Sequence, residues 1–117
     1  MAKIVFLLTE GPWQTENWEV FAKFADAALD KGHEVETFWY LDGVYNAIKH
    51  QGFPDTPEPP VVKMKKVVEK GANIIACGLC VNARGLQGGK EYIEGITVGG
   101  LPDFAEMVGE ADAVITL

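Results

Sequence analysis

The arrangement of apolar residues in the first third of the chain is the feature that most restricts how it can fold. Residues 3–9 form a nearly continuous apolar run, which is typical of a strand buried on both faces of a parallel sheet. Residues 14–31 then repeat apolar side chains at helical spacing up to Gly32, and residues 33–40 alternate like a second strand. A strand, a long helix and a strand in this order predict a βαβ unit with a right-handed crossover.

The alternation of helices and strands continues to the end of the chain. We expect further helices over residues 42–50, 61–70, 78–86 and 101–110, and further strands over residues 73–77, 96–98 and 113–117. Four prolines fall between Gln51 and Pro60, a density that predicts a loop and not regular structure. The pattern therefore predicts a single α/β domain over residues 1–117, with about five strands and no internal repeat.

The overall composition excludes several classes of protein. Lys and Arg number 10 against 17 Asp and Glu, for a net charge of -7, so the chain offers no basic stripe for direct binding of nucleic acid. Two cysteines are too few for the disulfide framework of a small secreted protein. The apolar run near Met1 is too short for a signal peptide, and no stretch is long enough to cross a membrane. We therefore expect a cytoplasmic protein without a membrane partner.

The two cysteines, Cys77 and Cys80, lie where the third clear strand is expected to end and a helix to begin. In open α/β sheets this is the edge at which ligands bind. The free N–H groups of a first helical turn would point toward the Cys77 sulfur and favour its thiolate form, which is the nucleophile. Arg84 follows Cys77 by seven residues, so on a helix its guanidinium could share the same stripe and assist.

Several alternatives remain open for this pair of cysteines. Both could be buried apolar residues, because free cysteine is among the most buried residue types. The Cys-x-x-Cys spacing also fits a dithiol–disulfide redox protein, although such motifs usually follow the first strands of their fold. A structural zinc ion needs four ligands, and His33 and His50 do not have the spacing of metal ligands, so we expect no metal within one chain.

Three further pairs of residues are expected at the same edge of the sheet: Gly11 and Pro12, Tyr45 and Asn46, and Gly99 and Gly100. The first pair is better explained by a turn than by phosphate binding, because the glycine spacing of a dinucleotide site is absent. The second pair could contact a ligand or partner, or merely cap and pack a short helix that begins at Asp42. The third precedes the last helix, whose N–H groups could face a small anion, although a tight turn is the simpler explanation.

Motifs spread from end to end of the chain resemble the DsrE family of sulfur-relay proteins, most closely its TusD-type members. The matching positions are Thr9, Gly11 and Pro12, residues 31–34, residues 42–47, Cys77 with Arg84 and Gly85, residues 95–101 and residues 104–106. The segment 42–47 is a distinctive family motif, and the spacing from Cys77 to the Arg84-Gly85 pair matches that of the family's active cysteine. Their shared order makes the resemblance specific.

The resemblance implies an α/β fold, namely a three-layer α/β/α sandwich with a mostly parallel five-stranded sheet. It implies that Cys77 carries persulfide sulfur between donor and acceptor proteins without a cofactor, for transfer-RNA 2-thiouridine or in dissimilatory sulfur oxidation. It also implies a homo-oligomer, or a hetero-hexamer with DsrF- and DsrH-like sister subunits. An assembly subunit without a catalytic role is an alternative. Cys80 stands where relatives tend to have a small apolar residue, so it could be a resolving thiol, part of an internal disulfide or trisulfide, or a harmless substitution.

Overall fold

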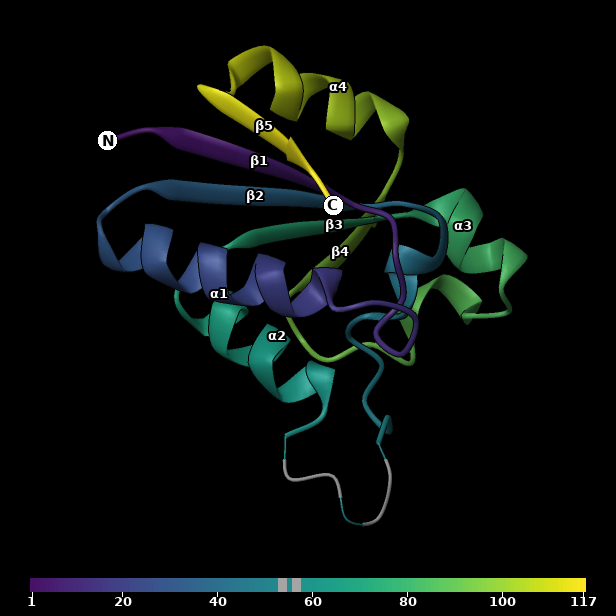
Figure 1. Ribbon diagram of the computed structural model, residues 1–117. Coiled ribbons are helices and arrows are strands. Elements are labelled where there is room, and N and C mark those ends of the chain that lie inside the picture. The colour runs from purple at the N-terminus through teal and green to yellow at the C-terminus, as the bar shows by residue number, and fades with distance from the viewer. Residues whose placement is uncertain (53–54, 56–57) are drawn as a thin grey trace.

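The computed structural model describes residues 1–52, 55 and 58–117, and a five-stranded sheet forms its centre (Figure 1). The strands are β1 (Lys3–Leu8), β2 (Glu34–Trp39), β3 (Asn73–Cys77), β4 (Ile96–Gly99) and β5 (Ala113–Thr116). They lie in the order β4-β3-β2-β1-β5, and each neighbouring pair is parallel. The expected sheet is therefore confirmed, and its pairing is parallel throughout these five strands.

Helices cover both faces of this sheet. They are α1 (Asn17–Asp30), α2 (Pro60–Glu69), α3 (Gly78–Ala83) and α4 (Leu101–Glu110), with short 3-10 helices η1 (Leu41–Tyr45) and η2 (Gln87–Gly89). In Figure 1, α1 and α2 lie side by side on one face, α4 lies on the other, and α3 lies beyond the carboxyl ends of the strands. This is the three-layer α/β/α sandwich that the resemblance implies. None of the helices in the described part of the chain is long and apolar enough to cross a bilayer.

Aromatic side chains from neighbouring strands fill the two halves of the core. Trp39, Phe6, Phe21 and Phe38 are the largest side chains without exposed surface. Phe6 of β1 meets Phe21 of α1 edge-on with ring centroids 5.1 Å apart, whereas Phe38 of β2 lies 5.3 Å from Phe104 of α4. The inner strands β1 and β2 therefore place aromatic side chains on both faces of the sheet, which explains why β1 is a nearly continuous apolar run.

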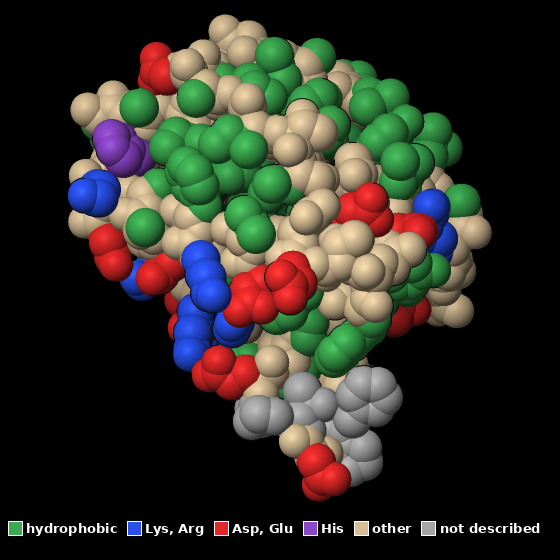
Figure 2. All heavy atoms as spheres, in the orientation of Figure 1, with side chains coloured by type: hydrophobic (Ala, Val, Ile, Leu, Met, Phe, Trp, Pro, Cys, Tyr) green, Lys and Arg blue, Asp and Glu red, His purple; other side chains and the backbone are tan. Residues whose placement is uncertain are grey.

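The layer formed by α4 covers the sheet less completely than the layer of α1 and α2. Met107 is the one buried side chain of α4, while Leu101 and Val108 are exposed. Val114 of β5 is exposed as well. In Figure 2, hydrophobic side chains gather over the upper half, where α4 and β5 lie, and charged side chains over α1 and α2. Apolar surface thus remains available on the α4–β5 side.

The segment after β2 is shorter and tighter than the sequence predicts. A helix is expected over residues 42–50, but the structure has a 3-10 helix at Leu41–Tyr45, after which the chain reaches Ile48 and bridges to Tyr92. Gly43 accounts for the difference, because its backbone lies directly against the carbonyl group of Leu8 at the end of β1. The turn is therefore fixed by close packing on the sheet and not by helix propensity.

Two other boundaries differ from expectation. The cysteine helix ends at Ala83 instead of near Leu86, because Gly85 turns the chain with a φ of 74°. The predicted loop over residues 51–60 falls partly on residues 53, 54, 56 and 57, which lie outside the described residues. Pro60 already belongs to α2, since proline suits the first turn of a helix.

Candidate functional site

Cys77 is the last residue of β3 and directly precedes α3, as the sequence predicts. Its backbone is extended, with φ -67° and ψ 118°, and the helix begins at Gly78. β3 lies between β2 and β4, and Cys77 is in register with Gly99 of β4. Cys77 is only 2% exposed. Its thiol therefore lies just inside the carboxyl edge of the sheet and not on the open surface.

Close backbone packing surrounds the start of α3. A Cβ atom at Gly78 would lie 3.1 Å from the carbonyl oxygen of Gly99, so the two segments approach as closely as glycine permits. At the start of α4, the N–H of Gly100 donates to Asp103 Oδ2 at 2.8 Å. Because this carboxylate already accepts from Gly100, the geometry of the Gly99-Gly100 pair fits a tight turn better than an anion site.

Cys80 lies one turn along α3, and its sulfur faces η1. The Leu41 N–H donates a hydrogen bond to Cys80 Sγ at 3.1 Å. Cys77 is the N-cap of α3 and lies three residues before Cys80, a spacing that places two side chains on the same side of a helix. Cys80 is buried, and this burial raises the pKa of its thiol, while the Leu41 N–H acts in the opposite direction. Neither cysteine is in a disulfide. The structure thus brings the two thiols together as free, buried groups.

Arg84 is paired with Asp42 and does not hydrogen-bond to sulfur. Its Nε atom donates to Asp42 Oδ1 at 2.7 Å, and its Nη1 atom donates to the carbonyl oxygen of Cys80 at 3.2 Å. The guanidinium holds the pKa of the Asp42 carboxyl below its usual value, and Gln14 assists by donating to Asp42 Oδ2 at 3.2 Å. Arg84 is therefore fixed beside Cys80, where its positive charge favours the thiolate of Cys80.

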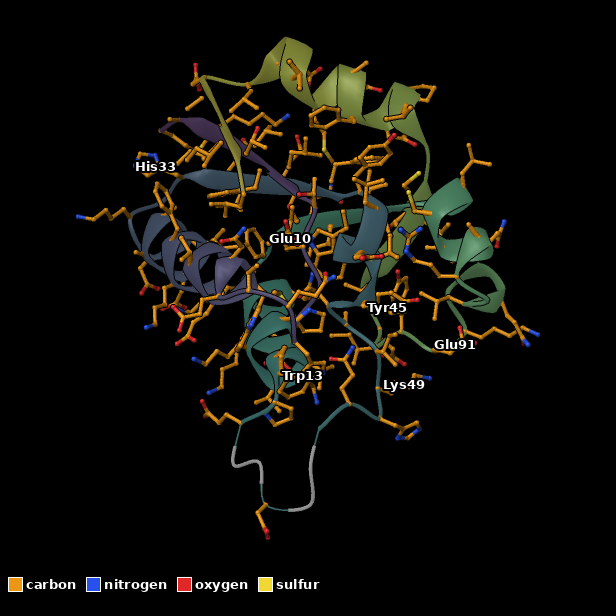
Figure 3. All side chains as sticks on the ribbon, turned by 45° about the vertical axis from the view of Figure 1, so that its right-hand side comes forward. Glu10, Trp13, His33, Tyr45, Lys49 and Glu91 are labelled. Atoms are coloured by element: carbon orange, nitrogen blue, oxygen red, sulfur yellow. The ribbon has the colours of Figure 1, made fainter. Side chains whose placement is uncertain are left out.

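The loop after β1 and the η1 helix form a surface pocket beside this cluster. It is lined by the predicted residues Gly11, Pro12 and Tyr45, together with Trp13, Gln14, Asp42 and Gln51. Figure 3 labels Tyr45 and Trp13, two of the residues that line this pocket. The N–H of Gly11 donates to Gln14 Oε1 at 2.6 Å. Hydrogen bonds therefore connect the Gly11 loop, through Gln14 and Asp42, to Arg84.

Asn46 is fully buried and so does not line this pocket. Its Nδ2 atom donates to the carbonyl oxygens of Glu10 at 3.0 Å and of Gly43 at 2.8 Å. These bonds tie the loop after β1 to η1. The sequence allows Asn46 either to contact a ligand or partner or to pack within the fold. This geometry supports packing and hydrogen bonding within the fold.

Two contacts of the site carry little signal in the sequence. Asp42 is expected to cap a helix, whereas in the structure it is the ion-pair partner of Arg84. One sequence signal could have revealed this pair. Asp42 follows β2 and Arg84 follows β3, and the carboxyl ends of neighbouring parallel strands lie at the same edge of the sheet. The hydrogen bond from Leu41 to Cys80 uses a backbone N–H, which every residue except proline carries, and therefore leaves no trace in the side-chain pattern.

His33 accepts a hydrogen bond from the N–H of Ala2 at 3.0 Å, before the start of β2 and hence at the opposite end of the sheet from Cys77 (Figure 3). Within residues 1–52, 55 and 58–117, no three His, Cys, Asp or Glu side chains come together as a group that could hold a metal ion.

Comparison with known proteins relates nearly the whole chain to one family. Residues 2–117 match the model of the DsrE/DsrF-like family. The chain is 35% identical over 112 residues to an uncharacterized protein of Methanopyrus kandleri, covering 96% of this chain and 91% of the relative. It is 30% identical over 86 residues, 72% of this chain and 66% of the relative, to a protein of Allochromatium vinosum named "Putative sulfurtransferase DsrE". The crystal structure of the ychN protein from E. coli covers 100% of both chains with a TM-score of 0.90 and 22% identity, which shows a shared fold.

Proposed function

Because the chain belongs to the DsrE/DsrF-like family, we propose that it acts in a sulfur relay in which Cys77 accepts sulfur as a persulfide and passes it to an acceptor protein. The observation that carries this proposal is the place of Cys77. It is a free thiol at the carboxyl end of β3, an inner strand of the sheet, and the Arg84-Gly85 pair follows at the spacing on which the resemblance to the family rests. Ligands of open α/β sheets bind at this edge.

The chemistry of the relay needs only thiol groups. The thiolate of Cys77 attacks the outer sulfur of a donor persulfide, a new S–S bond forms, and the donor leaves as its thiolate. In the second step an acceptor thiolate attacks the outer sulfur on Cys77, which leaves as a thiolate in turn. Each step exchanges one S–S bond for another, so no external oxidant, reductant, metal or cofactor takes part.

Access to Cys77 requires movement at the site, because its thiol is almost completely buried. Leu79 lies two residues further on and is 81% exposed, so it presents an apolar side chain to solvent on α3. We infer that donor and acceptor proteins dock over this exposed leucine and displace α3, a helix of only 6 residues. The 6 residues of α3 bury Cys80 and Val81, so a local opening of α3 exposes less of the core than the opening of a longer helix would.

The surroundings of Cys80 make it a poor sulfur carrier near neutral pH. Burial keeps the Cys80 thiol protonated to a higher pH than usual, and the protonated form is a poor nucleophile. The second candidate function is a dithiol–disulfide redox protein, which the Cys-x-x-Cys spacing of two free, buried thiols favours. In that case both cysteines would be needed for every turnover.

Two single substitutions form a matched test, because the chain has just 2 cysteines. Cys80→Ser leaves Cys77 as the only thiol, and Cys77→Ser leaves Cys80. After incubation with glutathione persulfide, intact mass spectrometry should show the mass of one added sulfur atom on Cys80→Ser and none on Cys77→Ser. Absence of the adduct from Cys80→Ser, or equal adducts on both variants, would contradict the relay assigned to Cys77.

The partners proposed for this relay are proteins. Exposed apolar side chains on α4 and β5, including Leu101, Val108 and Val114, support assembly as a homo-oligomer or with DsrF- and DsrH-like sister subunits. The sulfur would be destined for transfer-RNA thiolation or for sulfur oxidation in the cytoplasm. The negative net charge of -7 favours delivery through an acceptor protein over direct contact with nucleic acid.

A further inference from the structure

Cys80 is a second buried nucleophile that a relay through Cys77 alone does not use. It lies three residues after Cys77, on the same side of the first turn of α3, and its sulfur accepts the Leu41 N–H at 3.1 Å. Leu41 holds this N–H in place from a left-handed conformation, with φ 54°, which is uncommon for a residue other than glycine. The charge of Arg84 also acts on the Cys80 sulfur. A hydrogen-bond donor and a cation thus both favour a thiolate at Cys80 once its proton has left.

We propose that Cys80 discharges the persulfide of Cys77: its thiolate attacks the inner sulfur, Cys77 Sγ, forms the Cys77–Cys80 disulfide and expels the outer sulfur as hydrosulfide. This inference rests on the proposed function, which places the persulfide on Cys77. Geometry supplies the reason for the choice of target, because the first turn of α3 holds Cys77 Sγ on the same side as Cys80, whereas the outer sulfur is added only on loading.

Atoms and electrons balance in this step without an added oxidant. The bond between Cys77 Sγ and the outer sulfur breaks, and the bond between the two cysteine sulfurs forms. The two cysteine sulfurs together lose two electrons, and the outer sulfur gains them and leaves as hydrosulfide. The proton of the Cys80 thiol passes to solvent before the attack. A dithiol reductant must then reduce the disulfide before Cys77 can load again.

The loaded protein therefore has two competing fates. An acceptor thiolate takes the outer sulfur and regenerates both thiols, whereas Cys80 releases the sulfur as hydrosulfide when no acceptor arrives. The proximity of the two cysteines at the start of α3 favours discharge, since an attack within one chain avoids the entropic cost of a second molecule. Burial opposes it by raising the pKa of Cys80, so the persulfide has a finite lifetime near neutral pH.

The same burial predicts how discharge depends on pH. The titratable or charged groups that act on Cys80 are Cys77, Arg84 and Tyr92, and Asp42 and Tyr45 in η1 act in turn on Arg84. Below the raised pKa of Cys80 its thiolate fraction grows about tenfold for each pH unit, and the discharge rate should grow in proportion. A rate that is independent of pH would mean that the Cys80 thiolate is not the attacking group.

The test compares wild type with Cys80→Ser and Cys80→Ala after loading with glutathione persulfide and removal of the donor. Serine keeps an acceptor for the Leu41 N–H, whereas alanine does not. If Cys80 acts only through this structural contact, the two variants should behave differently. If its thiol is the attacking group, neither variant should discharge the persulfide. Samples are quenched with an alkylating agent at intervals for intact mass, and the released sulfide is trapped with monobromobimane. Circular dichroism melts confirm that the variants fold.

We expect wild type to release one equivalent of sulfide for each equivalent of added sulfur that it loses. Its product should contain the Cys77–Cys80 disulfide and be lighter than the unloaded chain by two hydrogen atoms. Both Cys80 variants should keep the added sulfur. If loaded wild type holds its sulfur as long as Cys80→Ser does and releases no sulfide, the discharge role is overturned, while loading through Cys77 still stands. If Cys80→Ser never acquires sulfur, the relay itself fails and the discharge step fails with it.

Discussion

Replacement of Gly43 by alanine tests whether close packing of η1 on β1 fixes the site. Gly43 is buried, and a Cβ atom there would overlap the carbonyl oxygen of Leu8 and lie 2.9 Å from its carbonyl carbon. The neighbour is backbone and cannot rotate away as a flexible side chain can. The Leu8 oxygen is also held in place, because it accepts the N–H of Tyr40 at 3.0 Å.

The cost of this substitution follows from the strain and from the hydrogen bond at risk. Overpacking of a well-packed region costs about 1–3 kcal/mol, and a contact with fixed backbone lies at the upper end of that range. Relief of the overlap by moving Leu8 would weaken the hydrogen bond from Tyr40, which contributes about 1 kcal/mol. We therefore expect Gly43→Ala to lower the free energy of unfolding by about 3 kcal/mol.

Gly109→Ala is the matched control, because nothing lies within 4 Å of a Cβ atom at Gly109 in α4. Alanine is the better helix former, so this variant should gain about 0.5–1 kcal/mol. Urea denaturation followed by circular dichroism measures both, as a shift of the midpoint at constant slope. The packing argument is refuted if the two variants shift in the same direction, or if Gly43→Ala loses less than about 1 kcal/mol.

Two further substitutions probe the contacts that hold η1. The buried hydroxyl of Tyr92 donates to the Val44 carbonyl oxygen at 2.5 Å, so Tyr92→Phe should cost about 1–2 kcal/mol in urea denaturation, and an unchanged midpoint would contradict this. Asp42→Asn tests the ion pair between Asp42 and Arg84. Arg84 lowers the pKa of Asp42 in the folded state, so the pair stabilises the fold at pH values above the usual pKa of a carboxyl group. This stabilisation is lost as the pH falls through the lowered pKa. In thermal melts, wild type should therefore lose slightly more stability on acidification than Asp42→Asn does. The effect is small because Asp42 is 39% exposed. Identical pH dependence of the two proteins would show that the ion pair does not contribute to stability.

The architecture was predictable from the sequence because its signals are local and repeated. Continuous apolar runs identify the buried parallel strands, and Gly32 and Pro102 mark a helix end and a helix start. β3 and α4 match their expected bounds, at residues 73–77 and 101–110. Once the strands are known to be parallel, the position of Cys77 at their carboxyl edge follows as well.

The finer geometry of the site was not predictable, because it depends on contacts between segments distant in sequence. The η1 helix is short because Gly43 packs on Leu8, a contact between neighbouring strand ends that helix propensity does not reveal. Placing Cys77, Cys80 and Arg84 on one face of a helix assumes that the helix continues beyond Arg84. In the structure Gly85 ends α3 earlier, and Arg84 pairs with Asp42. Asn46 shows the same limit, because only the fold reveals that it is buried.

The order of the strands has a consequence for how the chain folds during its synthesis. β1 is hydrogen-bonded to β2, which is made soon after it, but its other edge pairs with β5, at residues 113–116. Until that segment leaves the ribosome, a strand that belongs in the interior of the sheet keeps an open row of N–H and C=O groups. The segments that carry Cys77 and Cys80 are all made before this edge closes. The nascent chain therefore passes through a stage in which the thiols are in place while β1 is still open to pairing with another chain.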